Sequence, residues 1–177
     1  MIAPGYITDL VFVLMLGVSI ILMVSSARAG KTMPGIRRIA ALDAIDEAVG
    51  RATETNRPII FSPGTAGDFN DPQNFAAFSV LGHVSAKVAR NNARLIVATK
   101  LPQMQPVLEE IVRQGYIQEG VPEAFRPDDV RYLAFEQFAY ASGVVGIIHR
   151  EGVAVTMMIG PFWAESLIFA EAGFQAG

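Results

Sequence analysis

The most distinct pattern in the chain is one uncharged apolar run over residues 10–27, in which large apolar side chains occupy every helical face. At about 1.5 Å per residue, such a run gives a helix of about 27 Å, close to the hydrocarbon thickness of a bilayer. A helix at the margin of a soluble core shows a polar stripe instead. The pattern therefore predicts a transmembrane helix over residues 10–27, with the lipid bilayer as its partner.

The charges on either side of this run predict its orientation. Residues 1–9 contain no Lys or Arg, and the basic residues that follow the run are Arg28, Lys31, Arg37 and Arg38. Because positive charge marks the cytoplasmic side, we expect a single-pass protein of the cell membrane with its N-terminus outside and its main domain in the cytoplasm. A cleaved signal peptide is the alternative. It is disfavoured because a signal peptide carries its positive region ahead of the apolar core.

After residue 36 the chain alternates between amphipathic helices and short apolar strands. A first helix is expected between Pro34 and Pro58, with an apolar stripe at Ile36, Ile39, Leu42, Ile45 and Val49. A strand over residues 59–61 and a loop to Asp71 lead into a second helix, which starts at Pro72. Its apolar stripe consists of Phe75, Phe78, Leu81, Val84 and Val88.

The same unit repeats to the end of the chain. We expect strands over residues 94–99, 130–135 and 153–159. Helices are expected from Pro102 to about Gly115, over residues 136–150 with Gly152 just beyond the end, and from about residue 162. Strands that alternate with helices through short connections indicate a parallel sheet covered on both faces. The sequence thus predicts an α/β fold, a three-layer Rossmann-like domain with a mostly parallel sheet of about four strands.

The predicted organisation has four parts. Residues 1–9 form a short N-terminal segment, 10–27 the transmembrane helix, 28–35 a basic juxtamembrane linker, and 36–177 the Rossmann-like domain. A net charge of −3 leaves no basic field for nucleic acid. The absence of cysteine excludes a disulfide framework and thiolate metal sites. His83 and His149 are isolated, so no metal site is predicted.

The candidate ligand residues lie in the loops that follow the predicted strands, because ligands of parallel sheets bind beyond the carboxyl ends of the strands. These residues are Ser62, Gly64, Thr65, Gly67, Asp68, Lys100, Glu136 and Glu165. The loops lack the glycine patterns of nucleotide sites, and no serine lies in a nucleophile-elbow context. Lys100, Glu136 and Glu165 can form an acid–base cluster. The favoured alternative is that they are solvated or helix-capping residues, so we assign no catalytic residue and no cofactor.

The C-terminal helix is apolar on more faces than one sheet requires. Its candidate interface residues are Trp163, Leu167, Ile168, Phe169 and Phe174. Exposed apolar side chains of this size mark a contact with another protein, so we expect a homo-oligomer or a hetero-complex through this helix. A chain that stops short of its natural end is the alternative explanation.

Five segments resemble an uncharacterised family of membrane-anchored prokaryotic proteins. They are residues 41–54 (ALDAIDEAVGRATE), 57–65 (RPIIFSPGT), 93–99 (ARLIVAT), 137–141 (QFAYA) and 160–173 (GPFWAESLIFAEAG). The resemblance covers most of the chain after the apolar run. It implies a membrane tether and this α/β domain, a continuation toward a second apolar segment, and no catalytic residues.

The function favoured by the sequence is that of a membrane-tethered scaffold or interaction subunit of a larger membrane assembly, without catalysis. The alternative is a membrane-tethered small-ligand-binding domain or enzyme that uses the loops at the carboxyl ends of the strands.

Overall fold

The computed structural model describes residues 4–28 and 39–176, which belong to two separate units divided at residue 39. The first contains α1 (Pro4–Arg28), and its segment Ile7–Arg28 is long and apolar enough to cross a membrane, with none of it buried in the protein. The predicted span over residues 10–27 lies inside α1, which begins six residues earlier at Pro4. Apart from Arg28, the predicted linker over residues 28–35 lies outside the described residues.

The second unit is the predicted α/β domain. Its strands are β1 (Ile59–Ser62), β2 (Leu95–Thr99), β3 (Val130–Tyr132) and β4 (Val155–Met158). Its helices are α2 (Ala40–Asp43), α3 (Ile45–Thr55), α4 (Pro72–Arg90), α5 (Gln105–Gln118), α6 (Gln137–Glu151) and α7 (Glu165–Ala176). All strand pairs are parallel, in the order β3-β2-β1-β4. The strand order reverses between β1 and β4, which are direct neighbours.

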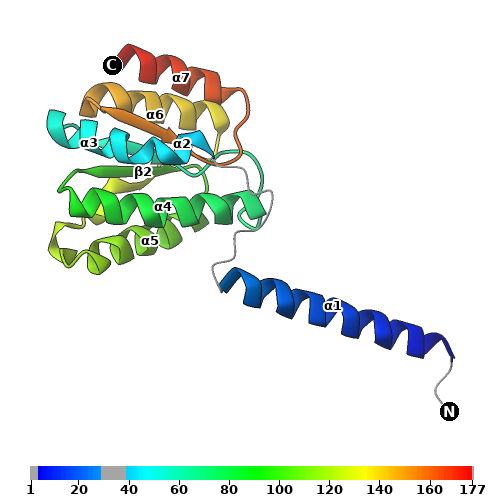
Figure 1. The fold of residues 1–177 in the computed structure, drawn as a ribbon. Coiled ribbons are helices and arrows are strands. Elements are labelled where there is room, and N and C mark those ends of the chain that lie inside the picture. The colour runs from blue at the N-terminus through cyan, green and yellow to red at the C-terminus, as the bar shows by residue number, and fades with distance from the viewer. Residues whose placement is uncertain (1–3, 29–38, 177) are drawn as a thin grey trace. The chain divides into compact units, whose positions relative to one another are not determined.

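The central strands β1 and β2 are buried on both faces, and their successive side chains pack into different layers. Ile59 and Phe61 of β1 pack with α3, α4 and α5, whereas Ile60 between them packs with α6 and α7. Figure 1 shows α4 and α5 on one side of the strands and α6 and α7 on the other. The predicted three-layer Rossmann-like arrangement is confirmed.

The first predicted helix differs from the observed one. The chain forms the short α2 and then α3, and only Ile45, Val49 and Ala52 are buried. Ile39 and Leu42 were expected in the core, but their side chains are exposed. An 11-residue helix spans about 16 Å, already more than the length of the four-residue β1, so the residues ahead of α3 have no strand to cover. Ile36 lies outside the described residues.

Further boundaries differ: β4 covers only Val155–Met158 of the strand predicted over residues 153–159, and α7 begins at Glu165 rather than near residue 162. Helix α5 was expected to end near Gly115 but continues to Gln118. Gly115 is needed for packing instead, because a Cβ there would lie 2.2 Å from Ser85 Oγ and 2.9 Å from the Ala86 amide of α4. Strand β3 stops at Tyr132, three residues before the predicted end. Gly152 does end α6, with a left-handed φ of 61°.

Candidate functional site

The loops that follow β1 and β4 are held against each other at the carboxyl end of the sheet. Gly64 and Gly160 both have positive φ, 110° and 144°. A Cβ at Gly160 would lie 1.9 Å from the carbonyl oxygen of Pro63, and a Cβ at Gly64 would lie 2.7 Å from that of Pro161. The amides of Thr65 and Ala66 donate to the Pro161 carbonyl at 2.8 and 3.0 Å. Only glycine allows the two backbones to approach so closely.

Glu165, one of the predicted ligand residues, is fully buried at this junction. Its Oε1 accepts from the Thr65 hydroxyl and from the Trp163 amide, the latter at 3.1 Å, and its Oε2 accepts from the Gln137 side-chain amide. These bonds tie the loop after β1, the start of α6 and the start of α7 to one carboxylate. Glu165 therefore stabilises the carboxyl end of the sheet with both of its oxygens engaged.

A second buried polar group lies beneath this carboxylate. The Tyr140 hydroxyl donates to the Ala98 carbonyl at 2.9 Å and lies 2.8 Å from the Ser62 hydroxyl. Burial raises the pKa of Tyr140, with the nearby Glu165 charge acting in the same direction and the Ser62 hydrogen bond opposing it. Tyr140 is therefore neutral and acts as a hydrogen-bonding cross-link between β1, β2 and α6.

The other predicted ligand residues lie at the same end of the sheet but in different settings. Lys100 donates from Nζ to the Thr65 carbonyl at 3.3 Å, and its Nζ lies 5.8 Å from the centre of the Phe135 ring. Gly67 and Asp68 belong to a local turn, in which the Asp71 carboxylate accepts from the Asp68 amide at 2.9 Å. Glu136 is exposed just ahead of α6 and caps no helical amide with its side chain.

The structure thus brings Thr65, Lys100 and Glu165 together and leaves Asp68 and Glu136 apart from them. Gln137 and Tyr140 are part of the same cluster and were missed in the sequence. Both could have been found from their position in the first turn of the helix that follows β3, where side chains face the carboxyl end of the sheet. Among the described residues, no group of three or more His, Cys, Asp or Glu side chains is arranged to hold a metal ion.

The amino end of the sheet carries a network of four charged side chains that the sequence reasoning did not identify. Arg94, just before β2, makes two hydrogen bonds to Asp129, at 2.9 and 2.7 Å, and one to Glu151 at 2.8 Å. Arg131 contacts both acids, at 3.2 and 3.3 Å. Asp129 raises the pKa of Arg94, and Arg94 lowers the pKa of Glu151. The signal for this network was a charged residue directly preceding each of the strands β2 and β3.

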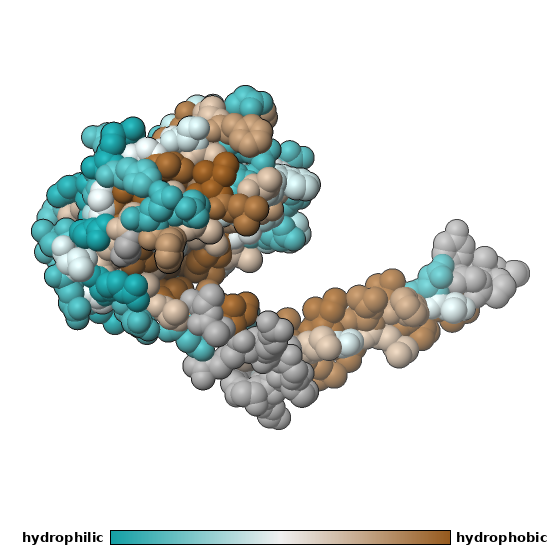
Figure 2. Space-filling model, turned by 90° about the horizontal axis from the view of Figure 1, so that it is seen from above, coloured by the Kyte–Doolittle hydropathy of each residue, from teal (hydrophilic) through white to brown (hydrophobic). Residues whose placement is uncertain are grey.

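Helix α7 has apolar side chains on two sides. Phe169 packs in the core against Tyr140 and Phe162, so it is removed from the predicted interface. Phe169 is buried because it lies on the face of α7 that covers the sheet. Leu167 and Phe174 are 76% and 85% exposed, and the remaining predicted interface residues, Ile168 and Trp163, are exposed as well. Figure 2, seen from the side of α6 and α7, shows apolar atoms gathered in a patch framed by polar ones.

The chain belongs to the family described as "Domain of unknown function (DUF6754)", whose family model matches residues 3–177. No curated protein and no solved structure matches the chain.

Proposed function

We propose that this member of the family is a membrane-tethered interaction subunit, held in the bilayer by α1, that binds a second copy of itself through the outward face of α7. The observation that supports it is that α7 is apolar on the side away from the core as well as on the core side. Leu167 and Phe174 lie seven residues apart on that outward side and are largely exposed. Covering a large apolar side chain is worth about 1.5–3 kcal/mol, which favours association.

The polar residues beside this patch suit a second copy. A shallow groove of about 380 Å³ runs between α6 and α7, and its lining includes Leu167, Ile168, His149 and Glu171. In a two-fold arrangement the same patch faces itself, so His149 of each copy can approach Glu171 of the other. Anchoring in a common membrane also raises the effective concentration of one copy for another.

The oligomeric state of the full chain in mild detergent tests this proposal. We expect the wild-type protein to be dimeric by light scattering, and the double variant Leu167→Asp, Phe174→Asp to be monomeric with an unchanged circular dichroism spectrum. Ile117→Asp is the matched control, because Ile117 is an apolar residue on α5 that is 41% exposed.

A monomeric wild-type protein contradicts the proposal, and so does a control variant that dissociates as readily as the double variant. If a single copy of the chain co-purifies with a different protein in fixed stoichiometry, that protein is the partner in place of a second copy.

The orientation is part of the same proposal, with the domain in the cytoplasm and α1 uncleaved. It is supported by Arg28 at the end of α1 and the basic residues that follow in the sequence. A reporter that is active only outside the cytoplasm, fused after residue 177, should remain inactive. Reporter activity, or a mature protein that begins near residue 29, contradicts this orientation.

Small-ligand binding at the carboxyl end of the sheet is the second candidate function. It is favoured by the meeting of Thr65, Lys100 and Glu165 there. A ligand would have to replace hydrogen bonds that these groups already make with one another. A thermal-shift screen of metabolites and nucleotides tests it. A hit that Lys100→Ala abolishes supports ligand binding, and the absence of any hit in the screen counts against it.

A further inference from the structure

A cavity of about 530 Å³ opens at the amino end of the sheet, opposite the end where ligands of parallel sheets usually bind. Its walls come from the ends of α3, α4 and α5, the residues that lead into β1, β2 and β3, and the segment 123–129. This volume lies within the range of about 300–1,000 Å³ that is typical of small-molecule sites. The cavity is therefore large enough for a metabolite-sized compound.

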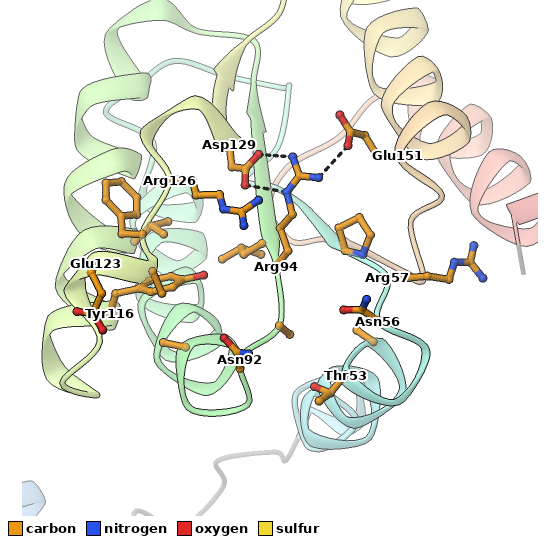
Figure 3. A pocket seen from close by; sticks show the side chains of 18 residues that line it. Thr53, Asn56, Arg57, Asn92, Arg94, Tyr116, Glu123, Arg126, Asp129 and Glu151 are labelled. Atoms are coloured by element: carbon orange, nitrogen blue, oxygen red, sulfur yellow. Dashed lines mark hydrogen bonds and ion pairs between the residues drawn. The ribbon is translucent and has the colours of Figure 1, made fainter.

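One wall of the cavity is held by paired charges. Arg94 is bound to Asp129 and Glu151, and both acids also pair with Arg131. Two positive and two negative charges cancel within this network. Figure 3 shows Arg94 between its two acidic partners at the edge of the cavity. The carboxylates of this wall are therefore already engaged.

Two hydrogen-bond donors on the cavity wall make no hydrogen bond to any residue that the structure describes. The Arg126 side chain is exposed and makes no hydrogen bond or ion pair within the described part of the chain. The Tyr116 side chain is buried, and its hydroxyl likewise lacks a hydrogen-bond partner among the residues that the structure describes. In Figure 3 the hydroxyl end of Tyr116 and the guanidinium of Arg126 both point into the cavity, toward Arg94. Burial raises the pKa of Tyr116, with the Asp129 charge acting in the same direction and the Arg126 charge opposing them, so this hydroxyl keeps its proton and acts as a donor.

The remaining charged residues that line the cavity are Arg57 and Glu123. The Arg57 side chain, which in Figure 3 points away from the cavity, donates to the carbonyls of Gly152, Val153 and Ala176 at the ends of α6 and α7. It thereby compensates the negative ends of these two helices. Glu123 lies beyond the Tyr116 ring in Figure 3. An unpaired guanidinium beside a phenol is suited to an oxygen anion.

The cavity also offers apolar surface for the body of such a ligand. The rings of Tyr116 and Phe125 lie 6.0 Å apart, and the other apolar lining residues include Ala52, Ala89 and Ala93. We propose that this cavity binds a small organic anion, whose carboxylate or phosphate group is held by Arg126 and the Tyr116 hydroxyl. The site is independent of the α7 interface.

Binding of citrate and of inorganic phosphate to the full chain in detergent tests the site, with sodium chloride of equal ionic strength as the reference. We expect saturable binding by calorimetry and a rise in the thermal midpoint, with citrate binding more tightly than phosphate because it also has an organic body. Arg126→Gln should weaken citrate binding at least tenfold. Tyr116→Phe should weaken it about threefold, since it removes one neutral donor and keeps the ring.

The control is Arg113→Gln, which removes the same charge from an exposed position on α5 outside the cavity. It should bind citrate as the wild-type protein does. The proposal is overturned if neither anion binds saturably, if Arg126→Gln binds as tightly as the wild type, or if Arg113→Gln loses as much affinity as Arg126→Gln. Tighter binding of phosphate than of citrate overturns the role given to the apolar wall.

Discussion

The polar residues at the two ends of the parallel sheet are bonded in different ways. At the carboxyl end, the loops after β1 and β4 are in contact through Gly64 and Gly160, and Glu165 receives three hydrogen bonds from neighbouring segments. At the amino end, the charged residues pair along one wall and leave Arg126 and the Tyr116 hydroxyl facing a cavity. The carboxyl end is thus closed by interactions of the chain with itself, whereas at the amino end these two groups make no hydrogen bond within the described part of the chain.

This difference shows that the fold predicts the edge of the sheet where a ligand can bind, but does not predict whether a ligand binds there. In parallel sheets the reversal of strand order opens a crevice beside the carboxyl ends of two strands. Here the reversal lies between β1 and β4, and the space beside it is filled by Pro161 and Glu165. Function therefore has to be argued from individual side chains rather than from topology.

The largest expected effect is at the glycine contact that closes the carboxyl end. Gly160→Ala places a Cβ 1.9 Å from the Pro63 carbonyl oxygen, at a φ of 144° that side chains rarely allow. We expect a loss of at least about 4 kcal/mol in the free energy of unfolding, because strain and displacement of the β1 loop combine. Urea denaturation of the full chain, followed by circular dichroism, measures it.

The matched control is Gly50→Ala in α3, where an added Cβ has no neighbour within 4 Å. Alanine is favoured over glycine in a helix by about 0.5–1 kcal/mol, so this variant should be slightly more stable than the wild type. A Gly160→Ala protein as stable as the wild type would show that the two loops separate freely.

The next effect concerns Glu165. Glu165→Ala leaves the Thr65 hydroxyl and the Gln137 amide without their buried acceptor, so we expect a loss of about 3 kcal/mol. Glu165→Gln should cost less than about 1 kcal/mol, since Gln137 can turn its own side-chain oxygen toward the new amide. Glu136→Ala, at an exposed position, should be neutral. Equal losses for the Ala and Gln variants would mean that the charge of Glu165, rather than its hydrogen bonds, matters.

The sequence was sufficient to predict the layers of the fold but not the contacts between distant side chains. Continuous apolar runs such as residues 95–99 predict strands covered on both faces, and the structure confirms them. The bonds of Glu165 to Thr65 and Gln137 join residues 100 and 28 positions apart, and no local pattern encodes such a distance. Phe169 and Leu167 are equally apolar in sequence, and only the direction of α7 over the sheet decides which one is buried.

At the amino end, the pair between Arg94 and Asp129 should contribute more to the free energy of unfolding than the other pairs of the network. Asp129 is 5% exposed and accepts two hydrogen bonds from Arg94. Asp129→Asn replaces one acceptor oxygen by a donor that faces a guanidinium, and we expect a loss of about 2 kcal/mol after allowing for the partial exposure of Arg94. The same urea titration measures it. An unchanged midpoint would indicate that the Arg94–Asp129 pair does not stabilise the fold.

The smallest expected effect is the pH dependence that Glu151 confers on the amino end. Its pKa is lowered from the ordinary value of 4.5, chiefly by its hydrogen bond from Arg94, so the folded state favours the ionised carboxylate. The stability that it contributes is fully present above pH 4.5 and is lost as the pH falls through the lower folded-state pKa. In Glu151→Gln we expect an unfolding free energy lower by about 1 kcal/mol at pH 7 and a smaller loss between pH 5 and about pH 3 than in the wild type. Parallel curves of unfolding free energy against pH for the two proteins would contradict this role. They would mean that Glu151 has the same pKa in the folded and unfolded states.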